Sequence, residues 1–248
     1  METAAQITKL PPTVMPPLSD LPERSFGSLF LAQPPEQLAA NEALFWEGDR
    51  AEHIFEVTDG VLRLFKVLPD GRRAITGFLF PGDVLGLAYR DKYLCTAEAV
   101  APTKVRRFRR SQFQAALGQS PELGRQLFAM MCDELSAAQD QVLLLGRKNA
   151  QERVASFLLA VARKLRAADS RVKSVILPML RQDMADYLGL TIETVSRVMS
   201  RLRADGVIAL PDPQRLVIRD YGALRRLSGE EQEAAMAVTV QHRAAWPH

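Results

Sequence analysis

The sequence predicts an α+β protein built from an N-terminal barrel or sandwich of short strands, a long amphipathic helix, and a C-terminal helical region that carries a β-hairpin. Between residues 26 and 108, short apolar runs are broken by turn residues roughly every ten positions. Over residues 122–145, apolar residues recur at three- and four-residue steps, which is the period of a helix. Within residues 181–206, a glycine separates two short amphipathic segments, and a hairpin pattern follows.

Length and composition set broad limits on the class of protein. The 248 residues are enough for one large domain or two modest ones, each with its own core. The chain holds 32 Lys+Arg against 29 Asp+Glu, a formal net charge of +3. Such a weak positive balance neither requires nor excludes nucleic acid as a partner, so the distribution of charge must decide.

Cysteines, histidines and apolar runs exclude several kinds of site. Two distant cysteines, Cys95 and Cys132, and three histidines give no disulfide framework and no metal-binding spacing. We find no Ser-His-Asp series or phosphate-binding glycine loop, so the sequence predicts no catalytic residues and no enzyme. The N-terminus lacks a secretory signal and no apolar run could span a membrane, so we expect a cytoplasmic protein.

Residues 1–25 are rich in proline and without periodicity, which predicts a flexible arm. Residues 26–118 are expected to form the strand domain. Its predicted turns lie at Gly48-Asp49, Asp59-Gly60, Asp70-Gly71 and Pro81-Gly82. The Asp70-Gly71 pair is a good hairpin turn, since glycine there tolerates positive φ.

A long helix is predicted within residues 119–147, with Ser120 as its N-cap and Pro121 in its first turn. Its narrow apolar stripe has two interpretations: a core helix lying over the barrel, or a seam along which two copies pair. The stripe favours the dimer seam. Its residues are Leu123, Leu127, Met130, Met131, Leu135, Ala138, Val142 and Leu145.

Residues 148–222 are expected to form a second domain. It starts with an amphipathic helix in "NAQERVASFLLAVARKLRAA", and a β-prone stretch follows in "VKSVILPM". The hairpin is predicted around Pro211-Asp212-Pro213. Helices begun by Asp220 and Ser228 and a polar tail complete residues 223–248.

The stretch "RQDMADYLGLTIETVSRVMSRLRADG" has helix-turn-helix spacing. Gly189 is expected to end the first helix in the left-handed conformation, and Thr191 to cap the second. Ala185 is small where two helices must cross, and Val195 is placed to pack back against the first helix.

The outward side of the second helix has the chemistry of a DNA-reading surface. Glu193 and Arg197 are neighbours at i, i+4, and Ser196 lies beside them. Arginine donates to guanine, glutamate accepts from cytosine or adenine amino groups, and an apolar residue such as Ile192 can touch a thymine methyl. The bland alternative is a surface ion pair between Glu193 and Arg197. Candidate phosphate contacts are Thr191, Thr194, Arg201 and Arg203.

From Phe26 to Asp220 the chain resembles the CRP/FNR family of transcription regulators. The similar motifs are "GDVLGL", "RKNAQERVASFLL" and "DMADYLGLTIETVSRVMSRLRADGVI". The resemblance implies an N-terminal double-stranded β-helix (a jelly-roll of the cyclic-nucleotide-binding type), a long dimerisation helix and a C-terminal winged helix-turn-helix.

The segment "YLGLTIETVSR" is most similar to the FNR and FixK branches. That similarity implies a homodimeric activator that binds a TTGA-N6-TCAA-like palindrome of double-stranded DNA, with Glu193, Ser196 and Arg197 as base readers and Ile192 as a weaker candidate. It also implies contact with RNA polymerase through Pro69, Asp70, Gly71 and Arg72. The alternative for that loop is an inert hairpin tip.

The sequence departs from relatives that carry an effector. FNR-type sensors hold an iron–sulfur cluster with four cysteines, and the two here cannot supply that set. Cyclic-nucleotide-binding members carry an Arg-Ser pair for the phosphate, where this chain has Leu94-Cys95. A FixK-like member needs no cofactor, which is the reading we favour.

Two further interpretations stay open. One is a ligand- or redox-sensing regulator that uses haem on His53, another effector in the strand domain, or oxidation of Cys95 or Cys132. The other concerns the basic group Arg106, Arg107, Arg109 and Arg110, which fits a solvated sheet edge or a contact with DNA flanks or polymerase.

Overall fold

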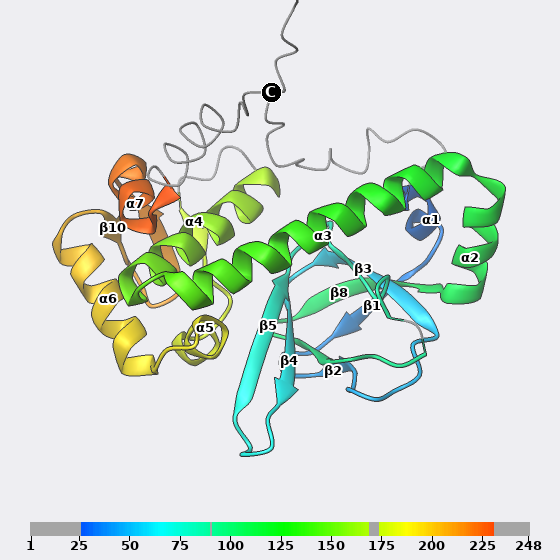
Figure 1. Ribbon diagram of the computed structural model, residues 1–248, viewed down its shortest axis with the longest axis horizontal. Helices are drawn as coiled ribbons and strands as arrows, with labels where there is room; N and C mark the ends of the chain where they lie inside the picture. The colour runs from blue at the N-terminus through cyan, green and yellow to red at the C-terminus, as the bar shows by residue number, and fades with distance from the viewer. Residues whose placement is uncertain (1–25, 90, 169–173, 231–248) are drawn as a thin grey trace, which may run out of the picture.

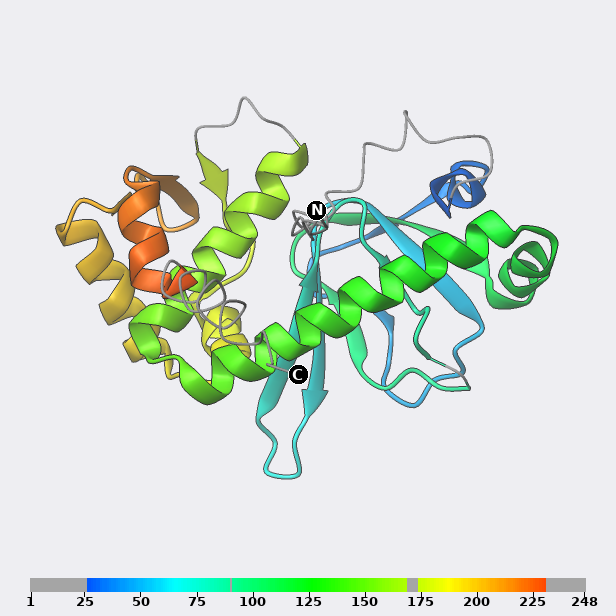
Figure 2. The same cartoon turned by 45° about the horizontal axis from the view of Figure 1, so that its top comes forward.

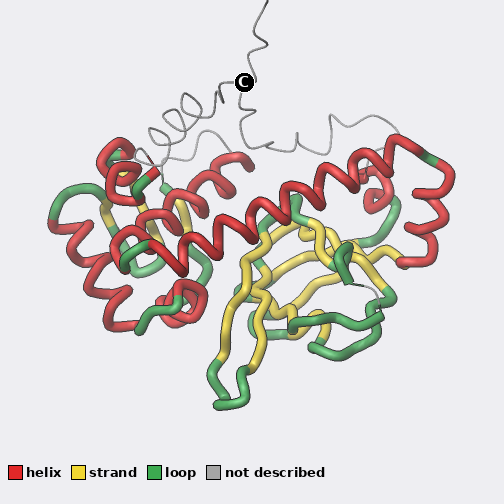
Figure 3. Tube along the Cα trace, viewed as in Figure 1, coloured by secondary structure: helices red, strands yellow, loops and turns green. Residues whose placement is uncertain are grey.

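The computed structural model describes residues 26–89, 91–168 and 174–230. Figure 1 shows a β-rich lobe and a helical lobe, with the long helix α3 (Pro121–Arg147) running along both. Figure 3 separates the two lobes by their strands and helices. Helix α3 therefore connects the two lobes and contributes to both.

The β-rich lobe is a roll of two antiparallel four-stranded sheets. Positive φ angles at Gly48, Gly60, Gly71 and Gly82 confirm the four predicted turns. The first sheet contains, in spatial order, β1 (Pro35–Leu38), β8 (Thr103–Arg109), β3 (His53–Asp59) and β6 (Val84–Leu85). The second sheet contains, in spatial order, β2 (Ala43–Phe45), β7 (Thr96–Ala99), β4 (Leu62–Val67) and β5 (Arg73–Leu79).

Aromatic rings fill the space between the two sheets. The rings of Phe45 and Tyr93 stack with centroids 3.7 Å apart, and Phe55 lies 5.8 Å from Phe45. Val57 of β3 pairs with Val105 of β8, and both are fully buried. Alternation along the strands therefore places one face of each sheet in a shared apolar core.

Two short helices were missed by the sequence prediction, which assigned this region to strands alone. Helix α1 (Phe26–Leu31) and helix α2 (Arg110–Gln119) pack together through the rings of Phe26 and Phe113, whose centroids are 5.0 Å apart. Leu123 of α3 joins the same cluster. Each helix buries too few apolar residues to show a helical period, so periodicity alone could not find them.

Helix α3 begins as predicted. The Ser120 side chain accepts a hydrogen bond from the Leu123 N–H at 3.4 Å, and Pro121 occupies the first turn. Leu127 and Met130 pack against the cluster of α1 and α2 on the inward side of the helix. The first half of α3 therefore serves as a core helix for the β-roll.

The C-terminal lobe surrounds α4 (Ala150–Ala168), whose side chains Val154, Leu158 and Ala162 are fully buried. The antiparallel hairpin predicted around Pro211 is present, and a third short strand extends it in the order β10-β11-β9. The elements are α4 (Ala150–Ala168), β9 (Val175–Ile176), α5 (Arg181–Leu188), α6 (Ile192–Ala204), β10 (Ile208–Ala209), β11 (Arg215–Ile218) and α7 (Tyr221–Ser228).

Asp220 begins α7 as expected, since its carboxylate accepts from the Ala223 N–H at 2.8 Å. Ser228 is the last residue of α7, and Gly229 follows in the left-handed conformation. The Ser228 hydroxyl also accepts from the Glu230 N–H at 3.4 Å, and the helix predicted to begin at Ser228 continues into residues that the structure does not describe. The predicted arm 1–25 and the helix and tail predicted beyond Glu230 lie outside the described residues. Within the described ranges, no helix is both long and apolar enough to cross a membrane.

The two lobes share apolar packing. Val61 and Phe80 come from the β-roll but belong to the core cluster of the C-terminal lobe. The Phe78 ring of β5 lies 6.0 Å from Phe157 of α4 and 5.5 Å from Tyr187 of α5, between centroids. Figure 2 shows the same contact region from a second angle, with the β4–β5 hairpin beside α5. The lobes therefore form one packed unit.

A matched pair of glycines tests the packing of the β-roll. Gly48 and Gly60 both have positive φ, but a Cβ at Gly48 would meet open space. A Cβ at Gly60 would lie 2.6 Å from the Pro102 carbonyl oxygen and 2.7 Å from the Thr103 Cα. Gly48→Ala should cost about 1 kcal/mol of unfolding free energy from φ alone. Gly60→Ala should cost roughly 1–3 kcal/mol more from overpacking, measured by urea unfolding. Equal costs for the two changes would contradict this account of the turn.

Candidate nucleic-acid interface

Helix α6 is delimited by the residues that the sequence singled out. Gly189 has φ +61° and ends α5 in the left-handed region. Thr191 Oγ1 then accepts from the Thr194 N–H at 3.2 Å and caps α6. The two short helices are therefore joined by a tight turn whose geometry depends on glycine.

The inward face of α6 packs on α5. Val195 and Leu202 of α6 are fully buried, and Ala185 of α5 is fully buried in the same cluster. This confirms the predicted roles of the small alanine at the crossing and the branched valine opposite it. Because the inward face is fixed by packing, the side chains on the opposite face have a defined direction.

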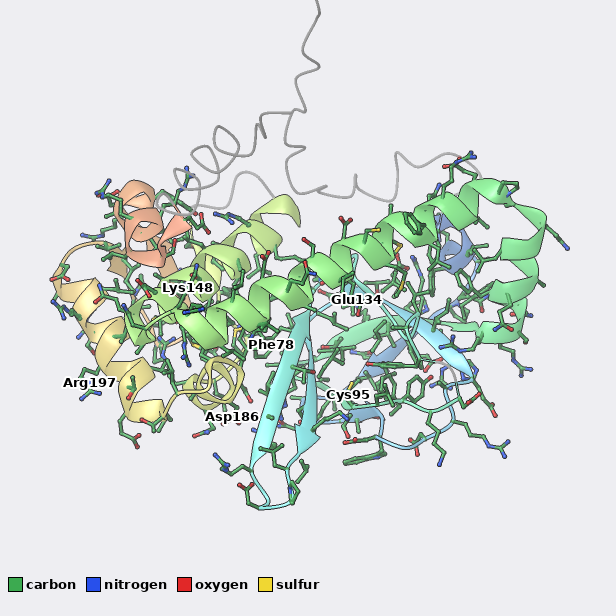
Figure 4. The ribbon with its side chains drawn as sticks, viewed as in Figure 1. Phe78, Cys95, Glu134, Lys148, Asp186 and Arg197 are labelled. Atoms are coloured by element: carbon green, nitrogen blue, oxygen red, sulfur yellow. The ribbon has the colours of Figure 1, made fainter. Side chains whose placement is uncertain are left out.

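The outward face of α6 carries polar side chains exposed to solvent. Glu193, Ser196 and Arg197 are all exposed, and Ile192 is 38% exposed at the start of the helix. Ser200, one turn beyond Ser196, is also exposed and was not singled out from the sequence. Figure 4 shows Arg197 pointing away from the protein at the outer side of α6. The three predicted base readers therefore lie together on one accessible surface.

The ion-pair interpretation of Glu193 and Arg197 does not match the observed contacts. Arg197 donates from Nη2 to Thr194 Oγ1 at 3.3 Å. Among the residues that the structure describes, no ion pair joins Glu193 to Arg197. Hydrogen bonds from the Glu193 backbone N–H and from Thr191 lower the pKa of the Glu193 carboxyl, so it stays an acceptor at neutral pH.

Candidate phosphate contacts flank this face. Thr191 and Thr194 lie at the N-terminus of α6, where unpaired backbone N–H groups and the helix dipole favour anions. Arg201 and Arg203 are exposed in its last turn. The Arg201 guanidinium lies 3.9 Å from the Asp205 carboxylate, a weak surface contact.

Arg153 of α4 joins the turn to the end of the long helix. Its guanidinium donates to three carbonyl oxygens: Leu188 at 2.9 Å, Leu145 at 2.8 Å and Lys148 at 2.9 Å. The first ends α5, and the other two lie at the C-terminus of α3. One side chain therefore fixes the helix-turn-helix against α3, a role that no local sequence pattern could predict.

Helix α3 leaves an apolar stripe exposed in the single chain. Phe128 is 72% exposed, Leu135 61% and Val142 71%. Leu123, Leu127 and Met130 lie on another side of the helix, in the chain's own core. The exposed stripe follows alternating steps of four and three residues and includes a phenylalanine that the sequence prediction omitted. Its positions are Gly124, Phe128, Met131, Leu135, Ala138, Val142 and Leu145.

The predicted polymerase loop is the tip of the β4–β5 hairpin, which projects from the roll in Figure 1. Pro69, Asp70, Gly71 and Arg72 are exposed. Arg72 donates from Nε to Asp70 at 2.8 Å, and this contact lowers the pKa of the Asp70 carboxyl. The tip is therefore accessible to a partner, and the contact between Arg72 and Asp70 stabilises its conformation.

The candidate effector residues have ordinary structural surroundings. Cys95 is buried, its Sγ lies 3.0 Å from the Tyr89 hydroxyl, and burial raises the pKa of the thiol, which disfavours the reactive thiolate. Cys132 is exposed on α3. His53 lies near Arg107, and burial followed by that charge lowers the pKa of its imidazole. Leu94 is 59% exposed and, like Cys95, offers no cation to a phosphate.

The basic group at the end of β8 makes contacts within the chain. Arg107 pairs with Glu36 at 2.8 Å, and Arg106 lies 3.5 Å from Glu56. Arg110 donates from Nε to the Ala51 carbonyl at 2.7 Å and also reaches the Gly86 carbonyl. These contacts favour the structural interpretation of the cluster.

Comparison with known proteins agrees with this architecture. The cyclic nucleotide-binding domain family matches residues 35–120, and the Crp-like helix-turn-helix domain family matches residues 152–227. FixK of Azorhizobium caulinodans, a nitrogen fixation regulation protein, is 46% identical over 194 residues, 78% of each chain. The transcriptional activator FnrL of Cereibacter sphaeroides is 37% identical over 80% of this chain and 82% of its own.

The solved structure of FixK2 from Bradyrhizobium japonicum superposes with a TM-score of 0.75 at 40% identity, covering 79% of this chain and 97% of that one. The fold and the exposed face of α6 thus define a DNA-binding transcription regulator with a winged helix-turn-helix. The chain belongs to the CRP/FNR family, in its FixK/FNR-like branch.

The role of Arg153 can be tested against a control on the same helix. Arg153→Met removes three charge-assisted hydrogen bonds and should lower the unfolding free energy by roughly 2–4 kcal/mol. Arg163→Met removes a surface pair with Glu230 and should cost less than about 1 kcal/mol. Urea unfolding of both variants measures the difference. If Arg153→Met lowers the unfolding free energy as little as Arg163→Met does, Arg153 does not fix the helix-turn-helix against α3.

Proposed function

We propose that two copies of the chain bind a palindromic DNA site of the TTGA-N6-TCAA type and activate transcription there. The observation that carries this proposal is the exposed face of α6, where Glu193, Ser196 and Arg197 stand side by side above a buried inner face. The similar proteins FixK and FnrL are named as a nitrogen fixation regulator and a transcriptional activator.

Each reader has a chemical counterpart in this half-site. The Arg197 guanidinium can donate two hydrogen bonds to guanine O6 and N7. The Glu193 carboxylate can accept from the amino group of cytosine or adenine, and Ser196 can serve as donor or acceptor. Ile192 is placed to touch a thymine methyl group. A helix that enters the major groove with this face therefore distinguishes base pairs at several positions.

Thr191, Thr194, Arg201 and Arg203 would hold α6 in register by phosphate contacts. The first two offer hydroxyls at the positive end of the helix, and the arginines offer charge in its last turn. These contacts carry no sequence information directly, so they should supply the salt-dependent part of the affinity.

Dimerisation is supported by the exposed stripe of α3. Alternating four- and three-residue steps are the spacing of a two-helix coiled coil, and large side chains such as Phe128 and Val142 stand in solvent in the single chain. A second copy related by a twofold axis would cover them. The centres of the two half-sites in TTGA-N6-TCAA lie about ten base pairs apart, one helical turn, as a twofold regulator requires.

Contact with RNA polymerase would use the tip of the β4–β5 hairpin, which is formed by Pro69, Asp70, Gly71 and Arg72. The tip projects from the β-roll, and its charged side chains are exposed. An activator that binds beside a promoter needs such an accessible protein surface, and loops are where binding residues concentrate.

Substitution of two arginines on α6 separates base reading from phosphate contact. Arg197→Ala should cost roughly 1–3 kcal/mol of discrimination at the guanine of the half-site. Arg203→Ala should weaken binding to all duplexes alike and reduce the slope of log affinity against log salt by about one phosphate contact. Quantitative gel shifts with TTGA-N6-TCAA and a guanine-substituted duplex measure both effects. Identical effects of the two changes would contradict the division of roles.

The dimer seam can be tested with neighbouring positions on α3. Leu135→Glu places a charge in the proposed seam, and burying an unpaired charge costs several kcal/mol, so the variant should be monomeric at micromolar concentration. Ser136→Glu adds the same charge on another exposed side of the helix and should leave the dimer intact. Sedimentation equilibrium distinguishes the two. A wild-type chain that sediments as a monomer would refute the dimer.

A further inference from the structure

A buried cluster of charges connects the β-roll to helix α5. Arg63 of β4 is only 6% exposed. Its Nη1 donates to Asp183 Oδ1 at 3.1 Å, and its Nη2 donates to Asn41 Oδ1 at 3.0 Å and pairs with Glu98. Asn41 and Glu98 belong to the β-roll, whereas Asp183 belongs to α5, so the guanidinium spans the boundary between the lobes.

Asp183 is equally specific in its contacts. It is 1% exposed, and its second oxygen, Oδ2, accepts from the Leu180 N–H at 3.1 Å at the start of α5. Arg73 of β5 reaches the same carboxylate at 3.4 Å and Asp186 at 3.6 Å, and its side chain is 34% exposed. One carboxylate therefore begins the helix and receives two guanidinium groups from the β-roll.

The opposite end of α5 is held by the other side of the molecule. Gln141 of α3 donates to the Tyr187 carbonyl at 3.3 Å, and Arg153 donates to the Leu188 carbonyl at 2.9 Å. Figure 4 labels Asp186 on α5 and Phe78 on β5, the two elements that meet at the boundary of the lobes. Helix α5 is thus fixed at its start by the β-roll and at its end by α3 and α4.

These contacts are directional, whereas the apolar packing nearby is not. Rings such as Phe78 and Tyr187 gain from burial in many relative orientations. A guanidinium that meets separate acceptors on both lobes permits few orientations, because its donors form a rigid fork. Buried ion pairs are weak contributors to stability, and their best-attested use is to fix register.

We propose that Arg63 and Arg73 are positioning residues for DNA recognition, which fix the angle of α6 relative to α3 and so set the spacing between half-sites that the dimer accepts. This inference rests on the proposed function. No residue of the β-roll needs to touch the DNA, because the two arginines act through α5, on which α6 is packed.

The spacing between half-sites is the property that Arg63 and Arg73 should control. In a twofold dimer, changing the spacer by two base pairs turns one half-site about the DNA axis by roughly a fifth of a turn relative to the other. A firmly held α6 cannot follow that rotation and loses contacts. A loosely held α6 can follow it, so the preference among spacers should fall while base discrimination within each half-site stays the same.

The experiment compares purified dimers on TTGA-N4-TCAA, TTGA-N6-TCAA and TTGA-N8-TCAA duplexes by gel shift. Wild type should bind the middle spacer tightest. Arg63→Met should reduce the affinity ratio between the middle and the flanking spacers at least about fivefold, the lower end of ordinary coupling between sites. The guanine discrimination measured with a base-substituted half-site should be unchanged. A general loss of folded protein would instead lower the apparent affinity for all duplexes alike and leave the spacer ratio as it is in wild type.

Because Arg63 is buried, its replacement removes a guanidinium from both Glu98 and Asp183 and can impair folding. Two basic residues of the β4–β5 hairpin supply a milder matched pair. Arg73→Met removes the outer contact with α5, whereas Lys66→Met removes a surface pair with Glu47 at 3.1 Å. Circular dichroism melts establish that each variant is folded. Only Arg73→Met should broaden the accepted spacing.

Two results would overturn the inference in different ways. If wild type binds no palindrome at low salt, the proposed function fails and the inference fails with it. If wild type prefers one spacer and folded Arg63→Met or Arg73→Met keeps that preference unchanged, the proposed function survives and the positioning role is refuted.

Discussion

The orientation of helix α6 depends on the contacts that fix helix α5 at both of its ends. Helix α6 packs on α5 through Val195 and Ala185, so the direction of its outward face follows that of α5. Charged groups bind both ends of α5, with Arg63 at its start and Arg153 at its end. Each uses a guanidinium that bridges separate elements, and apolar packing fills the space between them. The orientation of the exposed face of α6 thus depends on contacts from both lobes.

Charges at the surface and in the interior play different roles here. Glu193 and Arg197 are exposed, and their value lies in what they can bind rather than in stability. Arg63 and Asp183 are buried and directed at each other, so their value lies in the geometry they impose. Under the proposed function, the same residue types serve recognition on one side of the helix-turn-helix and orientation on the other.

Local features were predictable from the sequence because their causes are local. The turn at Gly189, the caps at Ser120 and Thr191 and the hairpin around Pro211 each follow from residues a few positions apart. Helices α1 and α2 were missed because each has few apolar residues, and these form a core only where they pack against α3. Likewise, the stripe on α3 predicted an interface, but which side faces the chain's own core depends on tertiary packing. The contact between Arg63 and Asp183 joins residues 120 positions apart, beyond any spacing argument.

The most direct test is methylation interference on the TTGA-N6-TCAA duplex, since dimethyl sulfate marks guanine N7 in the major groove and adenine N3 in the minor groove. We expect methylation of the guanine in each half-site to block binding, at two positions about one helical turn apart. Interference confined to adenines, or to one half-site, would contradict the placement of α6 in two successive major grooves.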